Sequence, residues 1–337
     1  MEKIKEVLDA YGVYPKTIDK ITDRVYRVND GRFVYALKQS SLRKDTIANW
    51  EKTYQQAFEQ NISIILPVYI TENRKLYAEL DESIYYLTPW IDAENGKRDK
   101  QNIEFLFRNL GMMHAKTKKE QFIAADAFIR NFDTYRLFCE DAAANLIGAV
   151  EQFEKSRYMS PFELLVCTQY RDLEYALKEI NKRLKKLTDQ EDEKISWNYS
   201  LCHGQLNFSH MLFSNQTYLL NLERAKIDNA VMDLTGLFRS EITFYDSPSD
   251  ALIEQFSSYT AENELTDNEL QLLVIHLLDP NEYITIIQEV VNERTDGTMI
   301  TDLIRLQHAY RRIIFGLQLS GYIEKEYEMA VFDDLES

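Results

Sequence analysis

Six polar side chains that could take part in chemistry are concentrated between residues 203 and 228. They are His203, Gln205, His210, Asn221, Glu223 and Asp228. The amide of Gln205 can orient a hydroxyl group, but it is a far weaker base than a carboxylate. His203 and His210 could bind a transition metal, yet they lack the His-x-x-x-His spacing of helical metal sites, so we expect no metal centre from them.

The first ninety residues, which precede this group, are predicted to be rich in strands. Residues 21–28 and 32–38 are runs of β-branched and aromatic residues, and Asn29-Asp30-Gly31 between them is typical of a hairpin turn. Residues 45–60 contain no proline or glycine and predict a helix. Further strands are predicted over residues 62–70, 76–80 and 84–87, with Pro67 favouring an edge or a bend.

The rest of the chain is predicted to be mostly helical. The polar stretch around residues 92–102 marks a change in composition, so we expect one unit at 1–91 and another at 92–337. The strongest helical pattern is an apolar stripe with alternating spacings of four and three. It consists of Val166, Tyr170, Leu173, Leu177, Ile180, Leu184 and Leu187. A short hairpin is predicted within residues 211–220, and it must pack on something because two strands alone are marginally stable.

Composition excludes several classes of function. The 10 glycines are spaced so that no GxGxxG motif can form, and the GxxxxG pair of Gly316 and Gly321 is not followed by Lys and Ser or Thr. The net charge of −16 disfavours nucleic acid as a partner. The 3 cysteines are odd in number and form no CxxC motif, which indicates a reducing compartment. No segment has the length of uninterrupted apolar residues that membrane insertion needs, so we expect a cytoplasmic protein.

A strand-rich lobe, a connector and a larger helical lobe with one hairpin is the plan of the two-lobed, α+β kinase-like fold. Lys38 ends a strand where that template places the lysine that contacts phosphate, and Glu51 lies in the next helix, where it should pair with Lys38. Residues 85–90 would form the hinge, residues 203–210 the catalytic loop, and Asn221 would stand at the metal-binding strand end.

With these features the sequence resembles the aminoglycoside phosphotransferase and choline kinase-like family over essentially its whole length. More narrowly, it is similar to the spore coat-associated branch of that family, the CotS and YutH type. The narrower match lies in the run Leu66-Pro67-Val68-Tyr69, the hinge sequence Tyr-Tyr-Leu-Thr-Pro-Trp and the helical tail through Leu278-Asp279-Pro280. This resemblance implies synthesis in the mother-cell cytoplasm, a final location in the spore coat, and other coat proteins as partners.

The catalytic positions depart from the family pattern His-Gly-Asp-x-His-x-x-Asn. Gln205 replaces the catalytic aspartate, His210 replaces the asparagine, and Asn221 replaces the family's metal-binding aspartate. Magnesium prefers anionic oxygen ligands in tight geometry, whereas an imidazole nitrogen suits zinc or copper better. We therefore expect a degenerate site over residues 203–223, in which Gln205 and His210 are inactive and Lys38, Glu51 and Asn221 are a vestige of a nucleotide site.

Two alternatives remain open from the sequence. Glu223 or Asp228 could replace the lost metal ligands, and the protein would then be an active, ATP-dependent small-molecule kinase. A nucleotide-sensing module would instead keep affinity without turnover. The main prediction is a pseudokinase with a structural or assembly role in the endospore coat, with no required cofactor or metal and at most weak binding of ATP.

Overall fold

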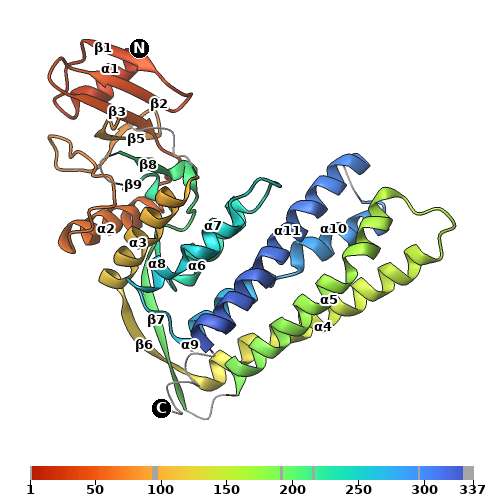
Figure 1. The fold of residues 1–337 in the computed structure, drawn as a ribbon. Coiled ribbons are helices and arrows are strands. Elements are labelled where there is room, and N and C mark those ends of the chain that lie inside the picture. The colour runs from red at the N-terminus through yellow and green to blue at the C-terminus, as the bar shows by residue number, and fades with distance from the viewer. Residues whose placement is uncertain (1, 93–97, 190–192, 215–216, 295–296, 329–337) are drawn as a thin grey trace.

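The computed structural model describes residues 2–92, 98–189, 193–214, 217–294 and 297–328. A small lobe built on an antiparallel sheet stands on a larger, mostly helical lobe (Figure 1). The elements of the small lobe are α1 (Glu2–Asp9), β1 (Thr17–Lys20), β2 (Val25–Asn29), β3 (Val34–Gln39), α2 (Ile47–Glu59), β4 (Ala78–Leu80) and β5 (Ser83–Pro89). The predicted kinase-like fold class is confirmed, while the boundary at residues 91 and 92 stays a prediction.

The five strands of the small lobe have the order β1-β2-β3-β5-β4, and every neighbouring pair is antiparallel. The predicted hairpin at Asn29-Asp30-Gly31 is confirmed, and its register pairs Val25 with Lys38. The strand predicted over residues 62–70 is wrong, because this segment forms only an isolated bridge from Ile65 to Leu219. Pro67 has no N–H group and cannot continue a ladder of hydrogen bonds.

The large lobe combines helices with two small sheets. Its helices are α3 (Lys100–Thr117), α4 (Ala125–Glu154), α5 (Pro161–Thr188), α6 (Val231–Glu241), α7 (Ser249–Glu254), α8 (Phe256–Thr260), α9 (Asp267–Leu278), α10 (Asn281–Val291) and α11 (Met299–Ile323), with a π-helical turn at Glu324–Glu328. Its strands are β6 (Lys119–Ala124), β7 (Lys194–Cys202), β8 (Met211–Phe213), β9 (Thr217–Leu219) and β10 (Lys226–Asp228). Strands β10, β7 and β6 form one sheet, and β8 and β9 form the predicted hairpin.

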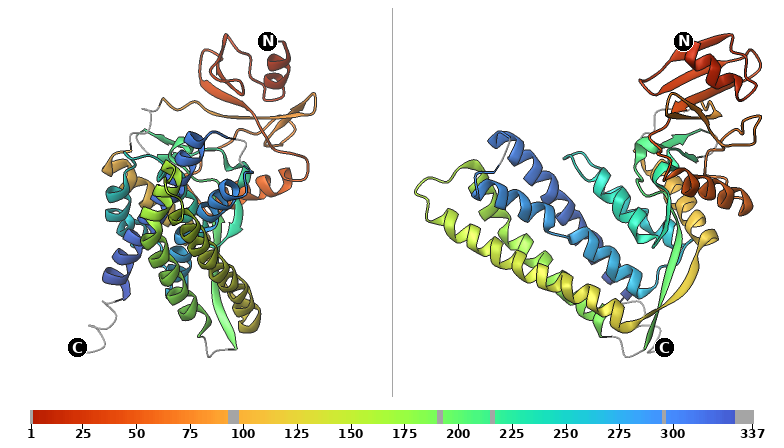
Figure 2. Two further views of the ribbon diagram at one scale, coloured as in Figure 1. Left: turned by 90° about the vertical axis from the view of Figure 1, so that its right-hand side faces the viewer. Right: turned by 180° about the vertical axis from the view of Figure 1, so that it is seen from behind.

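The long helices α4 and α5 lie side by side and project away from the small lobe, with α10 and α11 along them (Figure 2). The predicted apolar stripe lies on α5, where all its members are buried except the half-buried Tyr170. Ser160 begins α5 with a capping box, in which its side chain accepts from the Glu163 N–H while the Glu163 carboxylate accepts from the Ser160 N–H. Within the described residues, every helix is too short or too polar to cross a membrane.

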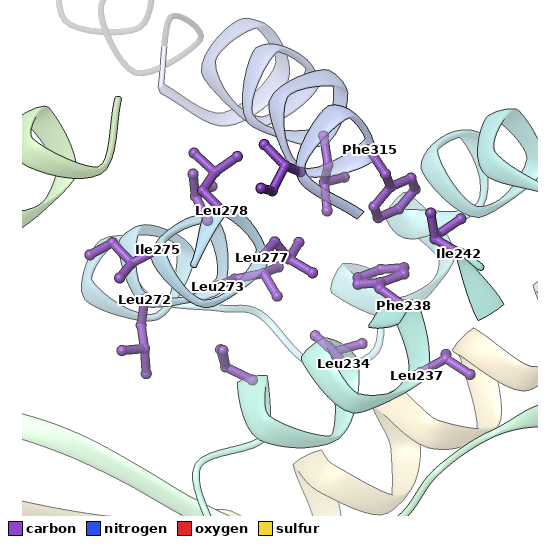
Figure 3. Close-up of a cluster of buried hydrophobic side chains, with 14 of the residues drawn as sticks. Leu234, Leu237, Phe238, Ile242, Leu272, Leu273, Ile275, Leu277, Leu278 and Phe315 are labelled. Carbon is purple, nitrogen blue, oxygen red and sulfur yellow. The ribbon is translucent and has the colours of Figure 1, made fainter. Parts of the chain in front are cut away.

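Helix α9 runs through the centre of the large lobe. Its residues are apolar on nearly all sides, which is the pattern of a helix surrounded by protein. Leucines of α9 pack against Leu234 and Phe238 of α6 and against Phe315 of α11 (Figure 3). This core gives α6 a fixed position, and α6 carries the carboxylate that holds the 203–210 loop.

The β8–β9 hairpin packs on the small lobe, which supplies the support that two strands alone would lack. Leu219 donates its N–H to the Ile64 carbonyl at 2.6 Å, and Leu66 donates to the Leu219 carbonyl at 3.1 Å. The hairpin thereby joins a segment of the small lobe to the loop that ends at His210. The lobes are thus connected by backbone hydrogen bonds as well as by the chain itself.

Candidate functional site

A cavity of about 370 Å³ lies between the two lobes, and we call it the interlobe cavity. The residues that line it are Val25, Ala36, Lys38, Tyr54, Leu66, Tyr86, Thr88, Pro89, Trp90, Ile91, Leu212, Leu220 and Asn221. Most of these side chains are apolar, and only a few groups can hydrogen-bond a ligand. This combination, at this size, is typical of a small-molecule or cofactor site.

Lys38 lies at the end of β3 and connects the two lobes. Its ammonium donates to Glu223 Oε1 at 2.6 Å and also to Asn221 Oδ1. The side chains of Lys38 and Glu223 are only 20% and 9% exposed, so this ion pair is partly shielded from water. Predicted site residues that are 183 positions apart in sequence, Lys38 and Asn221, are therefore in direct contact.

Both carboxylate oxygens of Glu223 are occupied. Oε1 accepts from Lys38 and from the Tyr86 hydroxyl at 3.2 Å, while Oε2 accepts from the Ser41 N–H at 3.1 Å and the Ser41 hydroxyl at 2.5 Å. Burial alone would raise the pKa of Glu223, but the Lys38 charge and the hydrogen bonds from Lys38 and Ser41 outweigh it and lower the pKa. Glu223 is thus an ionised carboxylate that is already fully coordinated by protein groups.

The backbone of the 203–210 loop is fixed by hydrogen bonds to Asp233, a buried residue in the first turn of α6. Its carboxylate accepts from the His203 N–H at 2.6 Å, from the Gly204 N–H at 2.9 Å and from His114 Nε2 at 3.3 Å. Burial raises the pKa of Asp233, but the hydrogen bond and charge of His114 together with His203 lower it below its ordinary value. The His114 ring is fixed in turn by Tyr259, whose hydroxyl is 2.8 Å from Nδ1.

His114, Cys202 and Asp233 each place one potential ligand atom within 4.8 Å of the others. All three residues are buried, and each already has a protein partner: the Cys202 thiol is 3.5 Å from the carbonyls of Asp228 and Asn229. Burial, followed by the charge of Asp233, raises the pKa of Cys202 well above its ordinary value, which opposes the thiolate that metals bind. The contacts of this cluster serve to support the loop.

The two loop histidines are stacked, with ring centroids 5.4 Å apart. His203 Nε2 is 2.7 Å from the Leu220 carbonyl and must donate to it, while His203 Nδ1 accepts from the Gln205 N–H at 3.3 Å. His210 Nδ1 likewise donates to the Gln205 carbonyl at 2.9 Å. Burial lowers the pKa of His210, and the nearby Lys38 charge acts in the same direction, so the neutral form of the ring is favoured. Gln205 itself is exposed.

Backbone conformation explains two residue types in the site. Gly204 has φ of +77°, and a Cβ there would lie 2.1 Å from the Arg224 carbonyl oxygen, so only glycine fits. Asn221 has φ of +61° and ψ of +43°, a left-handed conformation that asparagine and aspartate tolerate better than most residues. The backbone would therefore accept the family's aspartate at position 221 without rearrangement.

The structure contradicts one sequence prediction about carboxylates and shows where the two alternative metal ligands lie. The ion pair predicted between Lys38 and Glu51 is wrong, because Lys38 pairs with Glu223 and Glu51 lines a different cavity. Asp228, the other candidate metal ligand, lies on β10, where it accepts from Lys226 at 2.5 Å and from the Asn229 N–H at 2.8 Å. Of the two alternative metal ligands, Glu223 is the one that lies next to Asn221, since Lys38 donates a hydrogen bond to each of these two side chains.

The sequence indicated no role for Ser41 or Tyr259, and it placed Asp233 after the metal-binding strand end of the kinase template without indicating that it supports the loop. Asp233 lies in the first turn of α6, and an acidic residue there normally indicates only a favourable interaction with the helix dipole. Ser41 sits three residues after Lys38 in a loop, and no spacing rule connects it to Glu223. Their roles depend on tertiary contacts across 182 residues for Ser41 and about 30 for Asp233.

This arrangement, with a lysine on β3, a hinge strand, a loop supported by a helix and a cavity between two lobes, defines a kinase-like protein. The profile of the phosphotransferase enzyme family, APH, matches residues 17–266. This match covers well over half of the chain, and the chain belongs to that family. A search of curated proteins finds no match.

Several solved structures are similar in fold. An aminoglycoside phosphotransferase from Alicyclobacillus acidocaldarius has a TM-score of 0.69 at 16% identity, with 95% of this chain and 96% of that chain covered. A spectinomycin phosphotransferase bound to AMP has a TM-score of 0.56 at 12% identity, with 94% and 97% covered. An amicoumacin kinase in complex with AMP-PNP has a TM-score of 0.53 at 15% identity, with 92% and 91% covered. At these identities the likeness concerns the fold alone.

Proposed function

We propose that this protein is a pseudokinase of the phosphotransferase family with a structural or assembly role in the endospore coat. The observation that carries the first half is the charge pattern of the site. The three positions that should be chemically strict hold neutral side chains, Gln205, His210 and Asn221. The carboxylate beside Asn221, that of Glu223, is occupied by Lys38, Ser41 and Tyr86.

The residues present do not fit a magnesium ion. Asn221 offers one neutral oxygen, and that oxygen already accepts a hydrogen bond from Lys38. His210 offers nitrogen, which is a poor ligand for magnesium. Glu223 would have to release both Ser41 and Lys38 before it could bind a cation. Losing a single transition-state contact typically costs about 10²- to 10³-fold in rate, so three losses leave little turnover.

The interlobe cavity has the walls to bind an adenine-sized ligand, but its polar residues are poorly suited to phosphoryl transfer. Val25, Ala36 and Leu220 supply apolar walls, and Lys38 could contact a phosphate once it leaves Glu223. We therefore propose weak nucleotide binding that does not depend on magnesium. The chain's own residues would bind and orient the nucleotide, and Gln205, at the position of the family's catalytic aspartate, is too weak a base to accept the proton of a substrate hydroxyl efficiently.

The coat assignment rests on the resemblance to the CotS and YutH branch, and it is tested in spores. We expect Lys38→Ala protein to be present in purified coat extracts at the level of the unmodified protein. We expect Ile180→Asp protein to be missing, because a charge on the buried stripe of α5 costs several kcal/mol, a large part of a typical stability of about 5–15 kcal/mol. Cellular expression of each variant is measured in parallel. Well-folded Lys38→Ala protein that is made but excluded from the coat would contradict a purely structural role.

One specific observation favours a second candidate, an active small-molecule phosphotransferase with a relocated metal ligand. Glu223 is ionised and contacts the same lysine as Asn221. The test is ATP-dependent phosphorylation of choline, aminoglycosides and the protein itself against a heat-killed control. We expect no signal above the control. Magnesium-dependent turnover at about 1–100 s⁻¹ that disappears in Glu223→Gln would instead establish the enzyme.

A further inference from the structure

A second and larger cavity lies on the other side of Tyr54, and we call it the outer cavity. It has a volume of about 870 Å³, and it is bordered by α2, by the segment 61–70 and by the β8–β9 hairpin. Its lining residues are Glu51, Tyr54, Gln55, Ala57, Phe58, Asn61, Ile62, Ser63, Ile65, Pro67, Val68, Ile70, Leu76 and Tyr218. Among the described residues, Tyr54 alone lines both this cavity and the interlobe cavity.

The walls of the outer cavity are mainly apolar, and two large apolar side chains remain in water at its edge. Phe58 is 87% exposed and Ile70 is 61% exposed. Apolar side chains that line a hollow and stay exposed are a recognised feature of binding sites, because a ligand that covers them gains hydrophobic free energy.

The outer cavity also contains one carboxylate without a cation. Glu51 would be the partner of Lys38 in a kinase-like site, but Lys38 is engaged by Glu223, and no lysine or arginine of the described residues lies within 4 Å of Glu51. Lys116, which contacts the lining residue Asn61, donates to the Asn61 carbonyl at 3.2 Å. A carboxylate in an apolar hollow favours a ligand that brings a positive charge, because a charge-assisted hydrogen bond is stronger there than in bulk water.

We propose that the outer cavity is a ligand site for a hydrophobic organic amine, with its apolar body against Ile62, Pro67 and Val68 and its ammonium on Glu51. This site is separate from the interlobe cavity, and the inference holds whether or not the latter binds a nucleotide. Charge complementarity selects this occupant: a neutral ligand would leave Glu51 unpaired, and an anionic one would be repelled by it.

The test is calorimetric titration with three ligands of similar shape: phenethylamine, neutral phenethyl alcohol and anionic hydrocinnamate. We expect the amine to bind at least about tenfold more tightly than the anion. Glu51→Gln should remove that difference while leaving the affinity for the alcohol unchanged. Glu6→Gln removes one exposed charge from α1 in the same lobe and should retain the difference.

Two further variants locate the site. Ser63 is exposed and lines only the outer cavity, so Ser63→Trp should fill it and abolish binding of both the amine and the alcohol. Ala36 lines only the interlobe cavity, so Ala36→Trp should leave amine binding intact. Thermal melting verifies that each variant is folded, and if Ser63→Trp unfolds, the comparison of Glu51→Gln with Glu6→Gln decides.

The proposal is overturned if the amine does not bind, or if it binds no better than hydrocinnamate. It is also overturned if Glu51→Gln and Glu6→Gln weaken amine binding equally, or if Ala36→Trp rather than Ser63→Trp abolishes it. The last result would place the amine in the interlobe cavity.

Discussion

The buried groups that hold the backbone of the 203–210 loop match what a kinase-like loop needs, whereas the loop's own side chains at the catalytic positions do not. Below the loop, Asp233, His114 and Tyr259 form a buried chain of hydrogen bonds that fixes the backbone at His203 and Gly204. At the surface, Gln205 and His210 lack the charges and donor types that phosphoryl transfer needs. The hydrogen bonds that hold such a loop can therefore persist when its catalytic side chains change, because these hydrogen bonds also stabilise the fold.

The largest effect should come from breaking the support. Asp233→Ala leaves the N–H groups of His203 and Gly204 without an acceptor in a buried place, so we expect a loss of about 3–5 kcal/mol in the free energy of unfolding. Urea unfolding measures it. The matched control is Asp228→Ala, which removes a partly exposed carboxylate that also accepts from one backbone N–H and one lysine, and should cost about 1 kcal/mol. Equal losses in the two variants would show that the hydrogen bonds of Asp233 to the loop contribute no more to the free energy of unfolding than those of a partly exposed carboxylate.

A smaller effect is expected from the loop's glycine. Gly204→Ala puts a methyl group against the Arg224 carbonyl at a positive φ, and the strain should lower the free energy of unfolding by about 1–3 kcal/mol. Gly148→Ala is the control, since its Cβ meets nothing within 4 Å in the helix α4 and should stabilise by up to about 1 kcal/mol. Thermal and urea unfolding of both variants would reveal the opposite signs, and a neutral Gly204→Ala would mean that the loop can move freely.

The Lys38–Glu223 pair should have a moderate, pH-dependent effect. The pKa of Glu223 is lowered in the folded state, so the pair contributes stability above the ordinary glutamate pKa of about 4.3 and loses it as the pH falls further. Lys38→Met should cost about 1 kcal/mol at pH 7, and the difference from the unmodified protein should shrink below about pH 4. Unfolding measured from pH 7 to pH 3 tests this, and a difference independent of pH would exclude Glu223 as the responsible group.

Local sequence signals predicted much of the fold but only part of the site. The hairpin at Asn29-Asp30-Gly31 and the stripe on α5 were predictable because turn residues and helical periodicity act over a few positions. The strands β6 and β7 were missed, since their pairing joins Lys119 to Tyr199 and depends on distant partners. The same limit applies to the site: motif spacing indicated Lys38 and Asn221, but only the packed structure reveals that Glu223, and not Glu51, takes the lysine.

The most direct test of the central claim is the affinity for ATP measured by calorimetry with and without Mg²⁺. The account predicts weak binding that changes by less than about threefold, because the positions that should hold the metal are neutral. A positive control is the triple variant Gln205→Asp, His210→Asn, Asn221→Asp, in which magnesium should strengthen binding by more than about tenfold. If magnesium strengthens ATP binding to the unmodified protein by more than about tenfold, equivalent to about 1.4 kcal/mol of coupling, the pseudokinase account is contradicted.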